Sequence, residues 1–331
     1  MKRNRPSPLL LAIAASLALA WLPGAALAQS VEPVFVTLGT DGGPVVRRER
    51  SQPANAVIVN GSVYLFDIGA GTQRQLALAG IDPGAVRAVF LSHHHLDHVG
   101  GLGPFLVNRW LLYSDSALPV IGPPGTRAMV GGIVAAAQPI VMAPVTIGGP
   151  PKPALAASID ARELDAAMDR PVLVYQDANI RVLAVANDHY HFAPGSAEAR
   201  FSRSYAFRIE TKSKTWVFTG DTGPSARLVD LARGADVLVS EVIDIPGVEH
   251  AMRANTHIPV VALPGLLAHM RQDHLTPAQV GAIAKQANVG MVVLTHLVPG
   301  DDGETDLSVY SAGVSAAFGG RVVVARDLDR F

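Results

Sequence analysis

Four histidines and one aspartate lie within six residues, in the segment His93-His94-His95-Leu96-Asp97-His98. The segment directly follows a short apolar run, 88–91, that we predict to be a buried strand. Imidazole and carboxylate are the ligands that zinc accepts where thiolate is lacking, and the chain has no cysteine. On a loop that leaves a strand, His93 and His95 can point to one side, where they could share one metal ion. Asp97 and His98 can reach a second position a few ångströms away. The spacing therefore suits a site for two metal ions.

Three further candidate ligands each follow an apolar run that we predict to be a strand. They are His189 after 180–186, Asp221 after 215–219 and His296 after 291–294. A charged residue buried at such a place needs a partner, because an unpaired buried charge is costly. Singly, each is more often structural, and Asp221 alone is also a candidate helix cap. Together with the histidine segment they favour a metal centre, and His191 stays open as an alternative to His189.

The elements that position these residues alternate between strands and helices. We predict strands over 31–38, 56–66, 88–91, 172–175, 180–186, 204–210, 215–219, 237–240, 291–295 and 321–325, and helices over 72–80, 225–232 and 277–286. Residues 101–170 are rich in Gly, Pro and Ala, and their role stays open. We find no internal repeat and no polar linker, so 29–331 is predicted to be one α/β domain.

The first 28 residues have the pattern of a Sec-type signal peptide. Basic residues at positions 2, 3 and 5 precede the apolar run Leu9–Leu22, and the small-x-small sequence Ala26-Leu27-Ala28 follows. We predict cleavage near Ala28 and a periplasmic or secreted protein without a stable membrane anchor. An uncleaved N-terminal anchor is the alternative, which the short apolar run disfavours.

The composition excludes several classes of protein. With 49% hydrophobic and 17% charged residues in 331, the chain can bury a large core and is not intrinsically disordered. The lack of cysteine excludes disulfides and a thiol nucleophile. The formal net charge is −1, so no general basic balance attracts nucleic acid, and we expect no nucleic acid partner.

The motifs together resemble the metallo-β-lactamase fold superfamily over residues 34–325. The stretch Leu65–Leu76, with Asp67-Ile68-Gly69-Ala70-Gly71 inside it, and the later His274-Leu275-Thr276-Pro277 are similar to one branch of that superfamily. This branch contains ribonuclease Z, arylsulfatases and cyclic-nucleotide phosphodiesterases. The resemblance implies a four-layer αββα sandwich, an α/β (α+β) fold, with a dinuclear metal site along one edge.

The resemblance also implies two Zn²⁺ ions, with Mn²⁺ or Fe²⁺ as alternatives, and a role for each site residue. The implied ligands are, for the first metal, His93, His95 and His189; for the second, Asp97, His98 and His296; and, bridging the two, Asp221. Asp97 would also orient the nucleophile, and His274 would protonate the leaving group. Asp67 and Glu241 are candidates to orient ligand histidines from behind.

These implications predict an exported metal-dependent hydrolase of a small-molecule phosphodiester or sulfate ester, with a hydroxide shared by the two metals as nucleophile. A lactone or thioester hydrolase with the same site, a mononuclear-iron persulfide oxygenase and a zinc-binding module without turnover are the alternatives. Ribonuclease Z itself is disfavoured, since an exported acidic protein does not meet precursor tRNA and no long basic arm is visible. A homodimer is compatible with the sequence.

An apolar stretch at 245–270 lies between the strand that ends at Ser240 and the His274 motif. Two interpretations are considered. The stretch is either a lid over the site that tunes substrate choice or one ordinary buried helix with a turn.

Overall fold

The computed structural model describes residues 32–113, 116–143 and 152–331, which belong to one compact unit. The predicted signal peptide lies outside the described residues. Among the described helices, none is long and apolar enough to cross a membrane.

The first sheet has six strands that lie in chain order. They are β1 (Val34–Gly39), β2 (Ala54–Val59), β3 (Ser62–Ile68), β4 (Val86–Phe90), β5 (Leu118–Gly122) and β6 (Ile159–Glu163). Strands β1 to β3 pair antiparallel, and β3 to β6 pair parallel. The parallel strands therefore all end at the same edge of the sheet.

The second sheet has seven strands in the order β13-β12-β11-β10-β9-β8-β7. They are β7 (Val172–Gln176), β8 (Arg181–Ala186), β9 (Tyr205–Glu210), β10 (Thr215–Phe218), β11 (Val237–Ile243), β12 (Met291–Val298) and β13 (Arg321–Val324). Strands β7 to β10 pair antiparallel, and β10 to β13 pair parallel. The second half of the chain thus repeats the plan of the first.

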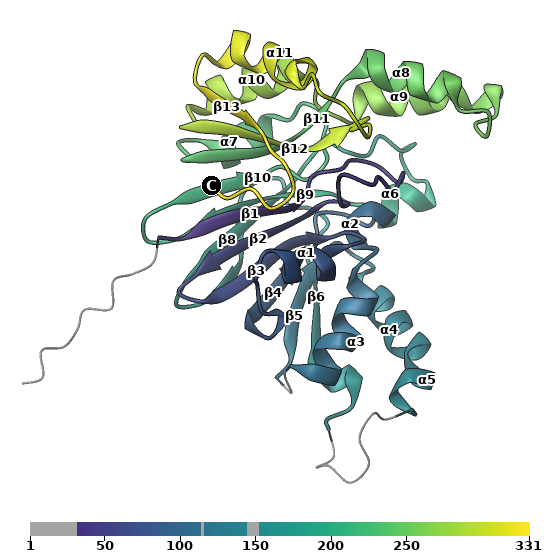
Figure 1. The fold of residues 1–331 in the computed structure, drawn as a ribbon, viewed down its shortest axis with the longest axis vertical. Helices are drawn as coiled ribbons and strands as arrows, with labels where there is room; N and C mark the ends of the chain where they lie inside the picture. Colours follow the sequence, from purple (N-terminus) through teal and green to yellow (C-terminus); the bar gives the residue numbers. More distant parts are fainter. Residues whose placement is uncertain (1–31, 114–115, 144–151) are drawn as a thin grey trace, which may run out of the picture. The chain divides into compact units, whose positions relative to one another are not determined.

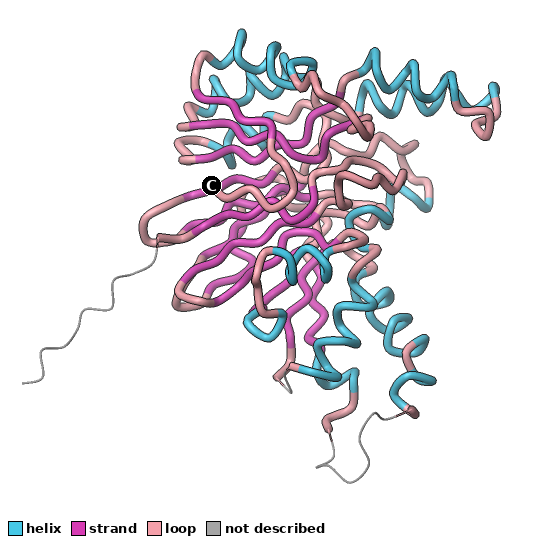
Figure 2. The backbone as a smooth tube through the Cα atoms, in the orientation of Figure 1, coloured by secondary structure: helices cyan, strands magenta, loops and turns pink. Residues whose placement is uncertain are grey.

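Helices cover the outer face of each sheet (Figure 1). The first sheet carries α1 (Thr72–Leu78), α2 (Leu96–Val99), α3 (Leu102–Leu112), α4 (Thr126–Ala136) and α5 (Gln138–Val141), with the 3₁₀ turns η1 (Pro83–Ala85) and η2 (Leu155–Ser158) beside them. The second carries α7 (Ala226–Ala232), α10 (Pro277–Ala287) and α11 (Ser308–Phe318), and the short α6 (Ala197–Phe201) precedes β9. Figure 2 shows the strands of the two sheets as neighbouring inner layers. The predicted αββα fold class is confirmed.

Aromatic rings fill the layer between the two sheets. Phe66 and Phe90 stack with ring centroids 4.7 Å apart, and Phe207 meets both rings edge-on. Side chains alternate along a strand, so Ala206 instead faces the helices on the outside of its sheet. Burial on both faces explains why these strands appear in the sequence as nearly continuous apolar runs.

Two regions differ from the sequence prediction. The run 56–66 is a hairpin of β2 and β3, because Asn60 and Gly61 take positive φ angles of 50° and 77° and form the turn between them. Residues 101–170 contain α3 to α5 and strands β5 and β6. A helix rich in Ala and Gly, such as α4, shows little contrast between its faces, so periodicity did not reveal it.

The stretch 245–270 forms a helical arm made of α8 (Ile245–Ala254), the 3₁₀ turn η3 (Val260–Ala262) and α9 (Leu263–Gln272). Within α8 and α9 only Val248 and Leu267 are buried. Glu249 pairs with Arg253 in its own helix and with Arg271 in the facing helix. The interpretation as one buried helix is therefore wrong.

Candidate metal centre

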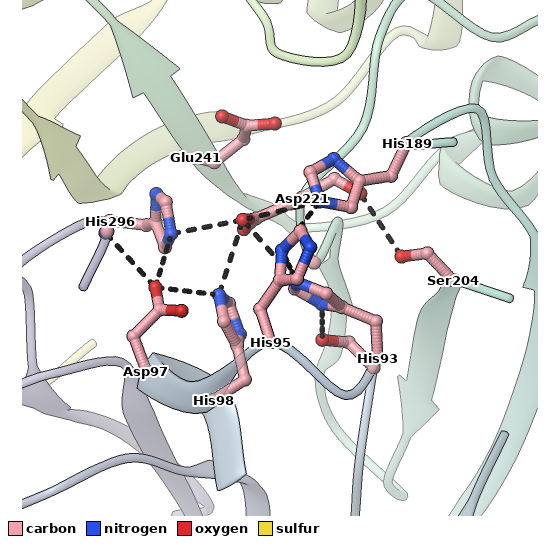
Figure 3. A network of polar contacts seen from close by, with 12 residues as sticks. His93, His95, Asp97, His98, His189, Ser204, Asp221, Glu241 and His296 are labelled. Carbon is pink, nitrogen blue, oxygen red and sulfur yellow. Dashed lines mark hydrogen bonds and ion pairs between the residues drawn. The ribbon is translucent and has the colours of Figure 1, made fainter. Parts of the chain in front are cut away.

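The seven predicted ligands lie together at one edge of the sandwich, on segments that leave the ends of strands (Figure 3). The loop after β4 and the first turn of α2 supply four of them: His93, His95, Asp97 and His98. The remaining three come from the second sheet, after β8, after β10 and near the end of β12: His189, Asp221 and His296. The other histidine of the segment, His94, contacts Thr126 Oγ1 at 3.0 Å and is not part of this group.

Three imidazole nitrogens converge in the first cluster. Nδ1 of His95 lies 3.0 Å from Nε2 of His93 and 3.1 Å from Nε2 of His189. Together with a carboxylate oxygen of Asp221, one ligand atom from each residue lies within 4.8 Å of the others. His189 is the member of this cluster, whereas His191 points toward Asp273 with its side chain 41% exposed. The geometry thus places His189, and not His191, in the first cluster.

The second cluster joins a carboxylate and two imidazoles. Oδ2 of Asp97 lies 3.4 Å from Nε2 of His98 and 3.5 Å from Nε2 of His296. Oδ2 of Asp221 lies between the clusters, 3.1 Å from Nε2 of His296 and 3.7 Å from Nε2 of His93. Asp221 therefore contacts a histidine of each cluster.

The donor atoms fit divalent cations. Among the described residues, Nε2 of His98, both ring nitrogens of His296 and Oδ1 of Asp221 are buried without a hydrogen-bond partner. Buried polar atoms without partners destabilise a fold, and bound cations would satisfy these atoms. The mixture of imidazole and carboxylate suits zinc.

The charge states of the ligands agree with this fit. Burial lowers the pKa of His93 and of His189 well below the usual range, so both rings are neutral at pH 7, the form that binds metal ions. Burial would raise the pKa of Asp97, but the charges on His98 and His296 lower it below the usual range. Burial also opposes a proton on His296, yet Asp221 raises the pKa of that ring to about 10. Negative charge that favours a proton there also favours a metal ion in its place.

A carboxylate behind the second cluster fixes one ligand ring. Asp67 Oδ2 accepts a hydrogen bond from Nδ1 of His98 at 2.7 Å, which leaves Nε2 for a metal. The backbone N–H and hydroxyl of Ser92 both donate to Asp67 at 2.7 Å. Asp67 therefore contacts a candidate ligand histidine, as the sequence analysis expected.

Glu241 contacts His274, whereas the sequence analysis expected it to orient a ligand histidine. Its Oε2 lies 2.7 Å from Nδ1 of His274, and its Oε1 accepts a hydrogen bond from the backbone N–H of Thr222 at 2.6 Å. Glu241 therefore orients His274 and not a ring of the two clusters. Both side chains are buried, and His274 still lines the cavity beside the metal ligands.

Sequence reasoning missed His269 and Asp273. Asp273 Oδ2 lies 2.5 Å from Nδ1 of His269, its other carboxylate oxygen contacts His191, and its backbone carbonyl accepts a hydrogen bond from His189 at 2.9 Å. The i,i+4 spacing of His269 and Asp273 at a helix end was the available signal, but it carries little weight without the fold. The helical arm thereby brings a further histidine to the site.

A cavity of about 230 Å³ opens beside both clusters. Its walls include ligands, the arm and the loop after β1: Gly43, Pro44, His95, Leu96, Asp97, Asp221, His269, Met270, His274, His296 and Val298. The N–H of Gly43 donates to Oδ2 of Asp97 at 3.0 Å, so this loop also holds a ligand in place.

Comparisons with known proteins identify relatives of this chain. Residues 63–297 match the family model described as a beta-lactamase superfamily domain. Ribonuclease Z of Mycolicibacterium paratuberculosis is 32% identical over 306 residues, which cover 90% of this chain and 97% of the relative. Among solved structures, the short form of human tRNase Z has a TM-score of 0.61 and 21% identity over 90% of this chain and 98% of its own. Zn²⁺-bound PqqB from Methylobacterium extorquens has a TM-score of 0.57 and 15% identity, over 90% of this chain and 99% of the PqqB chain.

The chain belongs to the metallo-β-lactamase fold superfamily of hydrolases. Within that superfamily it falls in the branch of ribonuclease Z and related phosphodiesterases, as its motifs implied. Membership implies binding of divalent metal, and the His and Asp clusters are groups that could hold it.

The expectation that no nucleic acid is a partner is wrong. Relatives that align over 90% of the chain are named ribonuclease Z, which points to a nucleic acid partner. The expectation rested on predicted export, on the lack of a visible basic arm and on the net charge of −1, which averages over the whole molecule. Attraction of a phosphate backbone depends instead on local positive charge, and bound metal ions are a strong source of it. A small-molecule ester is therefore no longer the expected partner.

Proposed function

We propose that this protein is a dinuclear zinc phosphodiesterase that cleaves RNA. The observation that carries the proposal is that residues of both ligand clusters and His274, which Glu241 contacts, line one cavity. The name of the relatives, ribonuclease Z, supports the choice of a phosphodiester over a sulfate ester or a lactone.

Bound in the two clusters, zinc ions would lower the pKa of water and offset negative charge on the phosphoryl oxygens. Asp97 and Asp221, which line the cavity, would accept a hydrogen bond from the attacking water and orient it. The N–H of Gly43 holds Asp97 in that position.

His274, which lines the cavity, would protonate the leaving oxygen of the substrate. Burial lowers its pKa, but the Glu241 carboxylate outweighs this effect and leaves the pKa of His274 above the usual value. Glu241 occupies Nδ1, so Nε2 is the nitrogen that would deliver the proton. A general acid must carry its proton before the reaction, and the raised pKa favours the protonated ring of His274.

A substrate panel on the purified, zinc-loaded protein tests the proposal. We expect turnover of a single-stranded RNA and of bis(p-nitrophenyl) phosphate, two zinc ions per chain by elemental analysis, and loss of both activities in a folded Asp97→Ala variant. Turnover of p-nitrophenyl sulfate or of a lactone without turnover of either phosphodiester would contradict the proposal. A single iron per chain with persulfide oxidation would point to the oxygenase alternative.

We further propose that residues 1–28 direct export and that 29–331 is the mature hydrolase domain. The basic start, the apolar run and the sequence Ala26-Leu27-Ala28 support this proposal. N-terminal sequencing of protein recovered outside the cytoplasm should begin at Gln29. Recovery of the intact chain with Met1 in the cytoplasm would contradict it.

A further inference from the structure

The segment Tyr190–Phe192 leaves the metal centre directly after His189, and the proposed mechanism does not use it. Asp273 holds this segment on one side at two points. Its carbonyl accepts a hydrogen bond from Nδ1 of His189 at 2.9 Å, and its carboxylate contacts Nδ1 of His191. The backbone here is therefore anchored to the base of α9.

Aromatic residues alternate with these two histidines along the segment. Tyr190 and Phe192 stack on each other with ring centroids 5.2 Å apart and 20° between the ring planes. The ring of Tyr190 lies 4.8 Å from that of His189 and 5.4 Å from that of His95. Phe192 is 41% exposed. A row of rings thus runs from two candidate metal ligands to solvent.

Packing of the fold does not explain this row. Among the described residues, Tyr190 and Phe192 belong to none of the apolar core clusters. Single exposed apolar residues are common on protein surfaces, but Phe192 continues a row of rings that starts at two candidate metal ligands. The outer ring is therefore available to a bound molecule.

We propose that Tyr190 and Phe192 form a stacking platform for a nucleobase of the substrate. This inference rests on the proposed function, because RNA carries a base next to each phosphate and single-stranded RNA can present that base for stacking. A nucleotide whose phosphate lies at the two clusters can place its own base, or the next one, beside Phe192. Every base has a π face, so such a platform binds single strands with little sequence preference.

Binding of two monophosphates to the zinc-loaded protein tests the platform without any turnover. Adenosine 5′-monophosphate and ribose 5-phosphate carry the same phosphate and sugar and differ in the base. Stacking of one base is worth about 5- to 140-fold in affinity. We expect calorimetry to show a preference of that size for adenosine 5′-monophosphate. Phe192→Ala should lower the ratio of the two affinities toward 1, and Phe192→Trp should keep this ratio.

Phe201→Ala is the matched control, because Phe201 lies in α6 and is 67% exposed. It should leave the preference unchanged. If Phe192→Ala instead weakens both monophosphates equally, or the wild-type protein shows no preference, the platform is refuted and the rings serve only to cover the ligand histidines.

A kinetic comparison separates this inference from the proposed function. Thymidine 5′-(p-nitrophenyl phosphate) and its abasic deoxyribose analogue share one leaving group. For Phe192→Ala, the loss in kcat/KM on the nucleoside ester should exceed the loss on the abasic ester by about 5-fold or more, mainly through KM. If neither ester is hydrolysed while the monophosphate preference still depends on Phe192, the phosphodiesterase proposal fails and the platform stands. Equal losses on both esters would overturn the platform alone.

Discussion

At the scale of single residues, carboxylates decide which nitrogen of a histidine is left for a metal ion or a substrate. Asp67 takes Nδ1 of His98, and Glu241 takes Nδ1 of His274, each at 2.7 Å. The same arrangement behind two rings leaves Nε2 free in both. In His98 that nitrogen belongs to the second cluster, whereas in His274 it is available to the substrate.

The role of His274 leads to a prediction about leaving groups. General acid catalysis is worth roughly 10²–10⁴-fold where the leaving oxygen is a poor leaving group, and little for a nitrophenolate. His274→Ala should therefore lose that factor on RNA, keep most turnover of bis(p-nitrophenyl) phosphate and retain both metals. Steady-state kinetics with elemental analysis checks this. Glu241→Gln should show a smaller loss of activity, again larger on RNA than on bis(p-nitrophenyl) phosphate. Equal losses on both substrates in His274→Ala would contradict the role.

Gly42 gives a second prediction at this scale. A Cβ atom there would lie 2.4 Å from Cγ2 of Val298 and 2.7 Å from Nδ1 of His296, closer than real contacts. Gly42→Ala should displace His296 and lower zinc content from two ions per chain toward one. Gly265→Ala, at a position where a Cβ meets nothing within 4 Å, is the control. Full occupancy by two zinc ions in Gly42→Ala would show that the ring is not held by this close approach.

At the scale of elements, the helical arm is attached at its base and exposed at its tip. Val248, Met252 and Met270 pack with Ile243 and Val298. At the tip, Val260 and Val261 are 82% and 90% exposed. Because His269 and Met270 line the cavity, the arm forms a wall of the site, which keeps the lid interpretation open for testing.

Trimming the arm tests its role in substrate choice. Replacing residues 256–262 by a short Gly-Ser linker removes exposed and half-buried side chains but no buried one, so the unfolding free energy should change by less than about 0.5 kcal/mol. If a long substrate follows the arm, KM for a polymeric RNA should rise several-fold while turnover of bis(p-nitrophenyl) phosphate stays. Denaturant titration and kinetics measure the two effects. An unchanged KM for RNA would show that the tip of the arm does not contribute to substrate binding.

A polar contact joins the two sheets away from the site. Oδ2 of Asp177, in the turn after β7, accepts hydrogen bonds from the hydroxyls of Tyr64 at 2.6 Å and of Tyr175 at 3.0 Å. Tyr64 belongs to β3 of the other sheet. Burial would raise the pKa of Asp177, but these hydrogen bonds lower it below the usual value.

This contact predicts a pH dependence of stability. A carboxyl whose pKa is lower in the folded state stabilises the fold above its unfolded pKa, and the stabilisation is lost as pH falls through the folded pKa. Below about pH 4, the wild-type protein should therefore lose stability more steeply than Asp177→Asn. At pH 7 the substitution should cost about 1–2 kcal/mol, since the group is half-buried. Urea titrations at several pH values measure both, with the exposed Asp169→Asn as an unaffected control.

At the scale of the whole molecule, the metal ligands connect the two halves of the sandwich. The first cluster takes His93 and His95 from the first sheet and His189 from the second, and Asp221 adds a further connection. A metal ion in this cluster would thus bind the folded chain and not the unfolded one. Its binding free energy adds to the free energy of unfolding.

Metal removal should therefore destabilise the protein. At a free zinc concentration 100-fold above Kd, one site adds about 2.7 kcal/mol, so the zinc-loaded protein should unfold at a higher temperature than the chelated one. Calorimetry of the two forms measures the difference. Asp221→Ala, which removes the bridging carboxylate, should lose most of the response to zinc. Identical transitions with and without metal in the wild-type chain would argue against ligands from both halves.

The sequence by itself determined the ligand types, most strands of the sandwich and the superfamily. These features depend on neighbouring residues: the spacing in His93–His98 and apolar runs that end in a polar residue are local. Net charge is not local, and for that reason it misled about nucleic acid.

Only the tertiary structure decided which distant residues meet. It placed His189 and not His191 in the first cluster, paired Glu241 with His274, and brought His269 to the cavity on the helical arm. Sequence spacing cannot decide these contacts, because they depend on how two sheets and an inserted pair of helices pack against one another. A side chain's neighbours across the sandwich are set by that packing and by the register of the strands.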